Sequence, residues 1–261
     1  MFRPGRKVST MASPGEKKKD ELAQKRAFMV DKAQFIVDAR YCNPILLGVG
    51  SYGVVCSAED KKRGRKRVAI KQIPHAFDST VDARHVLREV RLMRILRHPN
   101  IVPLKTIDEP LDYKSFKDIY LISPLSDFDL DGLLTKRHYK LETREVQWIT
   151  CQILRALKYI HSAHIVHRDL KPGNIVLSED LTVQLCDLGL ARYIDPDEES
   201  GLTKNVSTKS YRAPEVFLCG EVYDHKIDLW AVGLMLYEML SGAPLFRKAF
   251  KSQVDAIIAL I

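Results

Sequence analysis

Asp169, Lys171 and Asn174 carry three different polar groups, at offsets of two and five residues, in the stretch His-Arg-Asp-Leu-Lys-Pro-Gly-Asn. A carboxylate can take the proton of a hydroxyl group, an ammonium group can neutralise a phosphoryl group in transit, and an amide can bind a magnesium ion. A lone Asp or Lys is more often a solvated loop residue. The whole pattern instead predicts phosphoryl transfer, with Asp169 and Lys171 as catalytic residues and Asn174 as a metal ligand.

A second candidate site is the pattern Gly-x-Gly-x-x-Gly-x-Val, which begins at Gly48 between predicted strands at Ile45 to Val49 and Val54 to Ala58. Glycines alone are a weak signal, because tight turns use them whether or not a phosphate is near. A dinucleotide-binding fold would continue with a helix. Here β-branched residues, a basic turn and the strand Val68-Ala69-Ile70-Lys71 follow. This order favours a glycine loop over nucleotide phosphates that Lys71 holds.

Together these motifs resemble those of eukaryotic protein kinases, and the chain from about residue 37 to residue 261 resembles a mitogen-activated protein kinase. The resemblance implies an α+β fold with two lobes, a small β-rich N-terminal lobe and a mainly helical C-terminal lobe. We expect a flexible basic extension over residues 1–36, the N-terminal lobe with the start of the hinge over 37–125, and the C-terminal lobe over 126–261. We also expect the C-terminal lobe to be incomplete, because the chain stops where a further helix would run.

The resemblance implies ATP and Mg2+ as cofactors. Glu89, in a helix predicted to begin at a capping box of Ser79 and Asp82, matches the glutamate that pairs with the nucleotide lysine. Asp187, in the triplet Asp-Leu-Gly, matches the second metal ligand, and Ser123 matches the gatekeeper position. Asp129 could approach the ribose. The residues assigned to the nucleotide are Leu47, Gly48, Val49, Gly50, Ser51, Tyr52, Gly53, Val54, Val55, Ala69, Lys71, Glu89, Pro124, Ser126 and Val176.

A regulatory site is also implied. Counting back from Ala213-Pro214-Glu215 places Thr203-Lys204-Asn205 where the family has two phosphorylated residues, Thr and Tyr, around a variable one. The three positions that receive phosphothreonine are all arginine here, and one of the two that receive phosphotyrosine is Lys209. We therefore hypothesise activation by phosphorylation of Thr203 alone. The expected phosphate-receiving residues are Arg88, Arg168 and Arg192.

Arg212 matches the arginine that shapes the substrate pocket of proline-directed kinases. The implied partners are protein substrates with Ser/Thr-Pro sites and an upstream kinase. Ser210 departs from the family, which usually has tryptophan there. Thr208 matches the residue that hydrogen-bonds Asp169 and Lys171.

The distribution of charge bears on other partners. The net charge of +8 divides into +5 for Met1 to Arg26, +6 for Lys61 to Arg67, and −3 for the rest. No nucleic-acid-binding signature accompanies the basic segments, so the turn is interpreted as solvated and no nucleic-acid partner is expected. The longest apolar run, Leu229 to Leu240, is too short to span a membrane. We expect no membrane partner and a cytoplasmic or nuclear location.

Three rival interpretations remain. The chain could be a catalytically weak binding or scaffold protein with a kinase fold, or a nucleic-acid-binding module that uses the basic turn. Among kinases, a cyclin-dependent kinase is the nearest competitor. The position of Thr203 and the run Leu-Lys-Tyr-Ile-His-Ser-Ala from Leu157 favour the mitogen-activated group.

Overall fold

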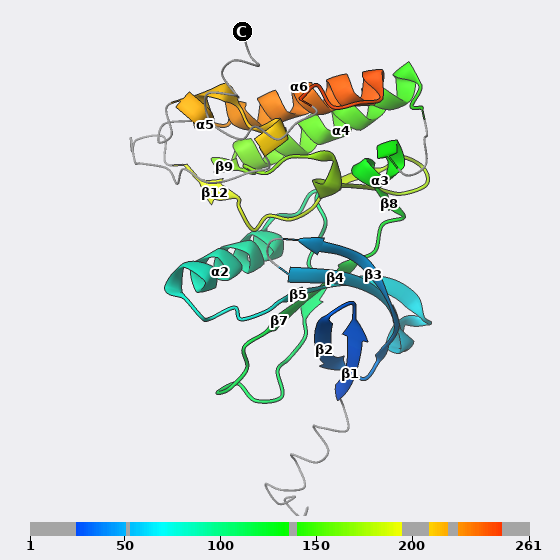
Figure 1. Cartoon of the computed structure of the whole chain (residues 1–261), viewed down its shortest axis with the longest axis vertical. Coiled ribbons are helices and arrows are strands. Elements are labelled where there is room, and N and C mark those ends of the chain that lie inside the picture. Colours follow the sequence, from blue (N-terminus) through cyan, green and yellow to red (C-terminus); the bar gives the residue numbers. More distant parts are fainter. Residues whose placement is uncertain (1–24, 51–52, 136–139, 195–208, 219–223, 247–261) are drawn as a thin grey trace, which may run out of the picture. The chain divides into compact units, whose positions relative to one another are not determined.

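The computed structural model of the 261-residue chain describes residues 25–50, 53–135, 140–194, 209–218 and 224–246 (Figure 1). The chain divides into two compact units. The first comprises Met1–Ala76 and Lys105–Ser123, and the second comprises Phe77–Leu104 and Pro124–Ile261.

The first unit is built from strands. An antiparallel hairpin precedes a five-stranded sheet with the order β3-β4-β5-β7-β6, and Tyr41, Cys56, Val68, Ile70 and Ile122 lie in its apolar core. The elements are β1 (Lys25–Val30), β2 (Ala33–Asp38), β3 (Tyr41–Gly50), β4 (Gly53–Asp60), the 3-10 turn η1 (Lys61–Arg63), β5 (Lys66–Ile73), β6 (Thr106–Ile107) and β7 (Ile119–Pro124).

The hairpin of β1 and β2 corrects the prediction of a flexible extension over residues 1–36. Phe35 and Val37 are fully buried, and the backbone N–H of Ile36 donates to the Tyr120 hydroxyl at 3.1 Å. The side-chain amide of Gln72 donates to the backbone carbonyl of Gln34 at 2.9 Å. The prediction rested on the composition of residues 1–36 as a whole, which does not reveal a short alternation of apolar residues. Such an alternation is enough to bury one face of a hairpin.

The second unit is mainly helical. Its apolar core is lined by α4, α6 and the short strands that flank the catalytic motif. The elements are α2 (Thr80–Ile95), β8 (Phe128–Asp129), α3 (Leu130–Thr135), α4 (Thr143–His161), β9 (Ile165–Val166), η2 (Pro172–Asn174), β10 (Ile175–Leu177), β11 (Val183–Leu185), β12 (Arg192–Tyr193), η3 (Lys209–Tyr211), α5 (Pro214–Leu218) and α6 (Lys226–Ser241).

Helix α2 begins where its cap was predicted, because the Ser79 hydroxyl accepts the backbone N–H of Asp82 at 3.1 Å. Residues 77–104, however, group with the second unit rather than with the sheet. Leu92 and Leu96 are buried in the apolar core of the second unit, and this burial explains why residues 77–104 group with that unit. The sequence-based boundary at residue 125 therefore differs from the observed division.

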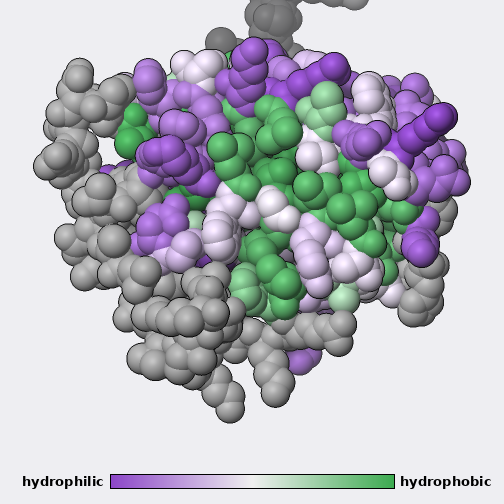
Figure 2. All heavy atoms as spheres, turned by 90° about the horizontal axis from the view of Figure 1, so that it is seen from above, coloured by the Kyte–Doolittle hydropathy of each residue, from purple (hydrophilic) through white to green (hydrophobic). Residues whose placement is uncertain are grey.

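Helix α6, which contains the apolar run Leu229 to Leu240, is only partly buried. Met235 and Met239 are buried, but Leu229, Tyr237 and Leu240 are exposed by 44%, 45% and 55%. Figure 2, seen from the side where α6 lies in Figure 1, shows apolar surface between polar regions. Within the described ranges, no helix is both long and apolar enough to span a bilayer.

Candidate active site

The structure brings Asp169, Lys171 and Asn174 together in the loop between β9 and β10. Lys171 Nζ lies 2.7 Å from Asp169 Oδ2. Asn174 Nδ2 donates to the Asp169 backbone carbonyl at 2.7 Å and to Asp169 Oδ2 at 3.1 Å. The three groups predicted to transfer phosphate therefore form one hydrogen-bonded cluster, and Asp169 is buried at its centre.

Asp228, at the start of α6, anchors this loop. Its Oδ1 accepts the backbone N–H of Arg168 at 2.9 Å, and its Oδ2 accepts the backbone N–H of His167 at 2.8 Å. His161 Nε2 lies 2.8 Å from the same Oδ2. A carboxylate that is 1% exposed needs such partners to offset the cost of burial. The anchor holds Arg168 at a φ of 71°, which a non-glycine residue seldom adopts.

Two further carboxylates meet at Gly189, after β11. A Cβ atom at this position would lie 3.3 Å from both Asp187 Oδ1 and Glu89 Oε2. A side chain at this position would crowd both carboxylates, and Glu89 is buried beside the Asp-Leu-Gly triplet. The backbone N–H of Cys186 donates to the Asn174 carbonyl at 3.0 Å, which ties this triplet to the catalytic loop.

The side chains of Asp187 and Asn174 fit a magnesium ion in chemistry, because Mg2+ prefers oxygen ligands and usually binds through one or two carboxylates together with substrate phosphates. Asn174 uses its Nδ2 group toward Asp169, which leaves Oδ1 as the ligand atom. No cluster of three or more His, Cys, Asp or Glu side chains suited to a metal occurs in the described ranges. Phosphate oxygens of a nucleotide would have to complete the coordination.

The first unit presents three of the predicted nucleotide residues on one sheet face. Val55 pairs with Lys71 across β4 and β5, and Ser57 pairs with Ala69. Because side chains alternate along a strand, Val55, Ala69 and Lys71 point to the same side.

The predicted glycine loop is partly described, since Ser51 and Tyr52 lie outside the described residues. Gly53 has a φ of 137°, and a Cβ atom there would approach the Gln72 carbonyl oxygen to 1.8 Å. Only glycine fits. Gly48 has no atom within 4 Å of such a Cβ, so its role is not steric in this conformation. Leu47 and Val49, from the same loop, are exposed by 47% and 65%.

Three other positions that the sequence assigns to the nucleotide lie in the second unit. Pro124 ends β7, and Ser126 lies between it and β8. Val176 in β10 pairs with Asp129 in β8. The Asp129 carboxylate accepts the backbone N–H of Gly132 at 2.6 Å, so at least one of its oxygens serves the start of α3 rather than a ribose.

The three predicted phosphate-receiving arginines lie on three segments of the second unit, and two of them interact electrostatically. Arg192 in β12 pairs with Val166 in β9, and Val166 lies two residues before Arg168 in the sequence. Burial and then the charge of Arg192 lower the pKa of Arg88 on α2. Thr203, Lys204, Asn205 and Thr208, which the sequence assigns to the same regulation, lie outside the described residues.

Sequence reasoning missed His85 as a fourth basic residue of this cluster. Burial lowers its pKa, and the charges of Arg88 and Arg168 act in the same direction while Asp82 opposes them. The spacing of three residues from Arg88 on a predicted helix was the available signal, because residues i and i+3 share a helix face.

Arg212 lies in the electrostatic reach of the catalytic carboxylate. Burial lowers its pKa, and the charge of Asp169 opposes this shift. The neighbouring Tyr211 hydroxyl donates to Glu238 Oε2 at 2.6 Å, and burial raises the pKa of Glu238. Glu238 was not singled out from the sequence, where it reads as one polar residue in an apolar helix. It fixes the segment that carries Arg212 to α6.

Comparisons with known proteins identify the family. Residues 41–260 match the protein kinase domain family, and the chain belongs to that family.

Within the family, the chain is similar to mitogen-activated protein kinases. It is 42% identical to "Extracellular signal-regulated kinase 1" of Dictyostelium discoideum, over 90% of this chain and 44% of that protein. It is 45% identical to "Mitogen-activated protein kinase HOG1" of Debaryomyces hansenii, over 81% of this chain and 52% of that protein. It is 40% identical to "Mitogen-activated protein kinase homolog NTF3" of Nicotiana tabacum, over 85% of this chain and 59% of that protein. The chain thus spans about half the length of these relatives.

Proposed function

We propose that the chain is an ATP-dependent protein serine/threonine kinase of the mitogen-activated type. The observation that carries this proposal is the hydrogen-bonded cluster of Asp169, Lys171 and Asn174 on a loop that Asp228 anchors. Such pre-positioned groups lower the barrier to phosphoryl transfer, which depends mainly on orientation and charge stabilisation.

Each residue of the cluster has a distinct role in this proposal. Asp169 orients the substrate hydroxyl and accepts its proton, and Lys171 stabilises the negative charge of the phosphoryl group in transit. Asn174 and Asp187 would hold Mg2+. When bound, the ion neutralises charge on the ATP phosphates.

Each unit carries residues that we assign to the nucleotide. In the first unit, Lys71 would hold the phosphates, and Val55 and Ala69 would contact adenine. In the second unit, Val176 would contact adenine, and Glu89 is the carboxylate assigned to the same role as in the family. The shared sheet face of Val55, Ala69 and Lys71 supports this assignment within the first unit, and the burial of Glu89 at Gly189 supports it within the second.

The test is phosphorylation of a protein rich in Ser/Thr-Pro sites by the purified chain, ATP and Mg2+. Transfer by the wild-type chain and its loss in Asp169→Asn would support the proposal. A matched control is Asp180→Asn, which removes a carboxylate in the turn between β10 and β11 and should leave transfer unchanged. Nucleotide binding without transfer in the wild-type chain would instead favour the catalytically weak scaffold.

Regulation by phosphorylation of Thr203 is part of the same proposal. It is supported by Arg88, Arg168 and Arg192, which bring like charges into one region of the second unit. A phosphate dianion would relieve their repulsion through charge-assisted hydrogen bonds. Unchanged transfer rates in Thr203→Ala, after treatment with an activating kinase, would contradict this.

A preference for Ser/Thr-Pro substrates rests on Arg212. Its segment is fixed to α6 by Tyr211 and Glu238, and its electrostatic coupling to Asp169 supports a place beside the phosphoacceptor. A positional-scanning peptide library tests this. Proline after the acceptor should be selected, and equal use of all residues at that position would reject the preference.

A further inference from the structure

The turn between β4 and β5 carries more positive charge than its shape requires. Lys61, Lys62 and Arg63 form η1, after which Gly64 and Arg65 take φ angles of 63° and 61°. The backbone N–H of Arg65 donates to the Asp60 carbonyl at 3.0 Å, and the Asp60 side chain accepts the backbone N–H of Lys62 at 3.1 Å. These contacts shape the turn without using a cationic side chain, so turn geometry leaves the charge unexplained.

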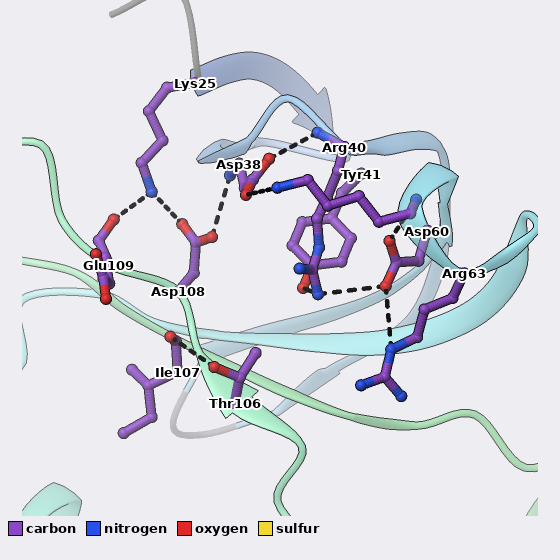
Figure 3. A network of polar contacts seen from close by, with 11 residues as sticks. Lys25, Asp38, Arg40, Tyr41, Asp60, Arg63, Thr106, Ile107, Asp108 and Glu109 are labelled. Carbon is purple, nitrogen blue, oxygen red and sulfur yellow. Dashed lines mark hydrogen bonds and ion pairs between the residues drawn. The ribbon is translucent and has the colours of Figure 1, made fainter. Parts of the chain in front are cut away.

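Folding adds two cations that are remote in sequence. Arg40 Nη2 lies 3.2 Å from Asp60 Oδ2, which Arg63 also approaches (Figure 3). Partial burial and the charge of Arg63 lower the pKa of Lys105, with Lys66 and Arg40 acting in the same direction and Asp60 opposing. Eight basic residues thus gather at this end of the first unit, and their mutual repulsion opposes folding. We call them the basic turn surface: Arg40, Lys61, Lys62, Arg63, Arg65, Lys66, Arg67 and Lys105.

Three acidic residues compensate only part of this charge. Lys62 lies 3.7 Å from Asp38, Arg65 lies 4.0 Å from Glu59, and these cationic side chains are exposed by 67% and 75%. Exposed ion pairs at such distances contribute little. With Asp38, Glu59 and Asp60 counted against it, the basic turn surface keeps a net charge of +5.

The geometry points to the basic turn surface as a docking site for membranes rich in anionic phospholipid headgroups. All residues from Lys61 to Lys66 are exposed at the tip of a hairpin, so their side chains can meet a flat surface together. Clusters of four to eight Lys and Arg recognise such headgroups, and long flexible cations need no groove to do so.

A single-stranded nucleic acid fits this surface less well. Proteins that bind it without sequence preference combine cations with aromatic rings on which the bases stack. Tyr41, the ring in this network, is buried at 1% exposure beneath Arg40.

Lys25, in β1, adds a further basic side chain at the same end of the first unit. Lys25 Nζ lies 2.5 Å from Asp108 Oδ2 and also donates to the Glu109 carbonyl (Figure 3). The other Asp108 oxygen accepts the backbone N–H of Asp38 at 3.1 Å, and Asp38 is the ion-pair partner of Lys62. Lys25, the first described residue, is thereby linked through Asp108 and Asp38 to the basic turn surface. The sequence-based expectation of a solvated turn and no membrane partner considered Lys61 to Arg67 without Arg40 and Lys105.

The experiment is co-sedimentation of the full chain with vesicles. Vesicles of phosphatidylcholine containing about a third phosphatidylserine should bind the chain, and pure phosphatidylcholine vesicles should not. The variant Lys61→Glu/Lys66→Glu should lose at least about 30-fold in partitioning, because each basic side chain contributes about a fivefold factor near an anionic surface. Neither lysine has an ion-pair partner in the described part of the chain, so the fold should persist.

The matched control is Arg144→Glu/Lys158→Glu, which makes the same charge change at exposed positions of α4. It should partition like the wild-type chain. An equal loss of partitioning in the control variant would show that binding depends on net charge alone rather than on the basic turn surface, and would overturn the proposal. Binding that persists unchanged in about 1 M salt would also overturn it, as would binding to RNA but not to the anionic vesicles. The salt titration of the wild-type chain decides the matter even if a variant fails to fold.

Discussion

The loop at residues 167–174 and the cluster of Arg88, Arg168 and Arg192 share Arg168 but differ in the signs of the charges that they bring together. In the loop, the Asp169 carboxylate has Lys171 and Asn174 within hydrogen-bond distance, and Asp228 receives two backbone N–H groups. In the cluster, burial and, to a smaller extent, the charge of Arg192 lower the pKa of Arg88. The loop thus pairs opposite charges within one short segment, whereas the cluster brings like charges together from three segments. This contrast distinguishes the two proposed roles, catalysis and regulation.

The largest effect on stability should follow loss of the loop anchor. Asp228→Ala leaves the backbone N–H groups of His167 and Arg168 buried without their acceptor, and we expect the free energy of unfolding to fall by about 3–5 kcal/mol. Urea denaturation followed by circular dichroism measures this. Asp224→Asn, which removes an exposed ion pair with Lys226 near the same helix start, is the matched control and should change stability far less. Equal losses in both variants would mean that Asp228 does not anchor the loop.

The arginine cluster should respond in the opposite way. Arg88→Gln removes like-charge repulsion, so stability should be unchanged or slightly higher in phosphate-free buffer. Added inorganic phosphate should stabilise the wild-type chain. The apparent affinity for phosphate should be about tenfold lower in the variant, because a charge-assisted hydrogen bond is lost. Thermal unfolding with increasing phosphate measures both quantities. A large loss of stability without phosphate would show that Arg88 has a structural role instead.

A smaller effect should come from His85. The lowered pKa of His85 means that the folded chain binds a proton less readily than the unfolded chain. Its contribution to stability is therefore present above the usual pKa of 6.5 and is lost as the pH falls below it. The charged groups that act on His85 are Arg88, Arg168 and Asp82. His85→Gln should flatten the stability profile below about pH 6.5, measured by urea denaturation at each pH. An identical slope in wild-type and variant would contradict this.

The loop and the cluster also differ in how far the sequence predicted them. Asp169, Lys171 and Asn174 lie within six residues of each other, so their spacing alone placed them together. The capped start of α2 was predicted for the same reason, because local signals determine local structure.

Contacts between distant segments were harder to predict. His85, Glu238 and Lys105 acquire their roles from neighbours remote in sequence, as burial and charge crowding arise only on folding. The prediction of a flexible extension over residues 1–36 was wrong for its last residues, because the β1–β2 hairpin buries Phe35 against Tyr120. The grouping of residues 77–104 likewise depends on the tertiary packing of Leu92 and Leu96.

The most direct test of the catalytic role of the loop is the rate of γ-phosphoryl transfer in a single turnover, measured with the affinity for ATP in the same samples. Asp169→Asn should lower the transfer rate by about 10²–10⁴-fold, because it removes the group that accepts the hydroxyl proton. ATP affinity should stay within about twofold, because Asp169 acts on the substrate hydroxyl rather than on the nucleotide. A transfer rate that Asp169→Asn leaves unchanged would contradict the account.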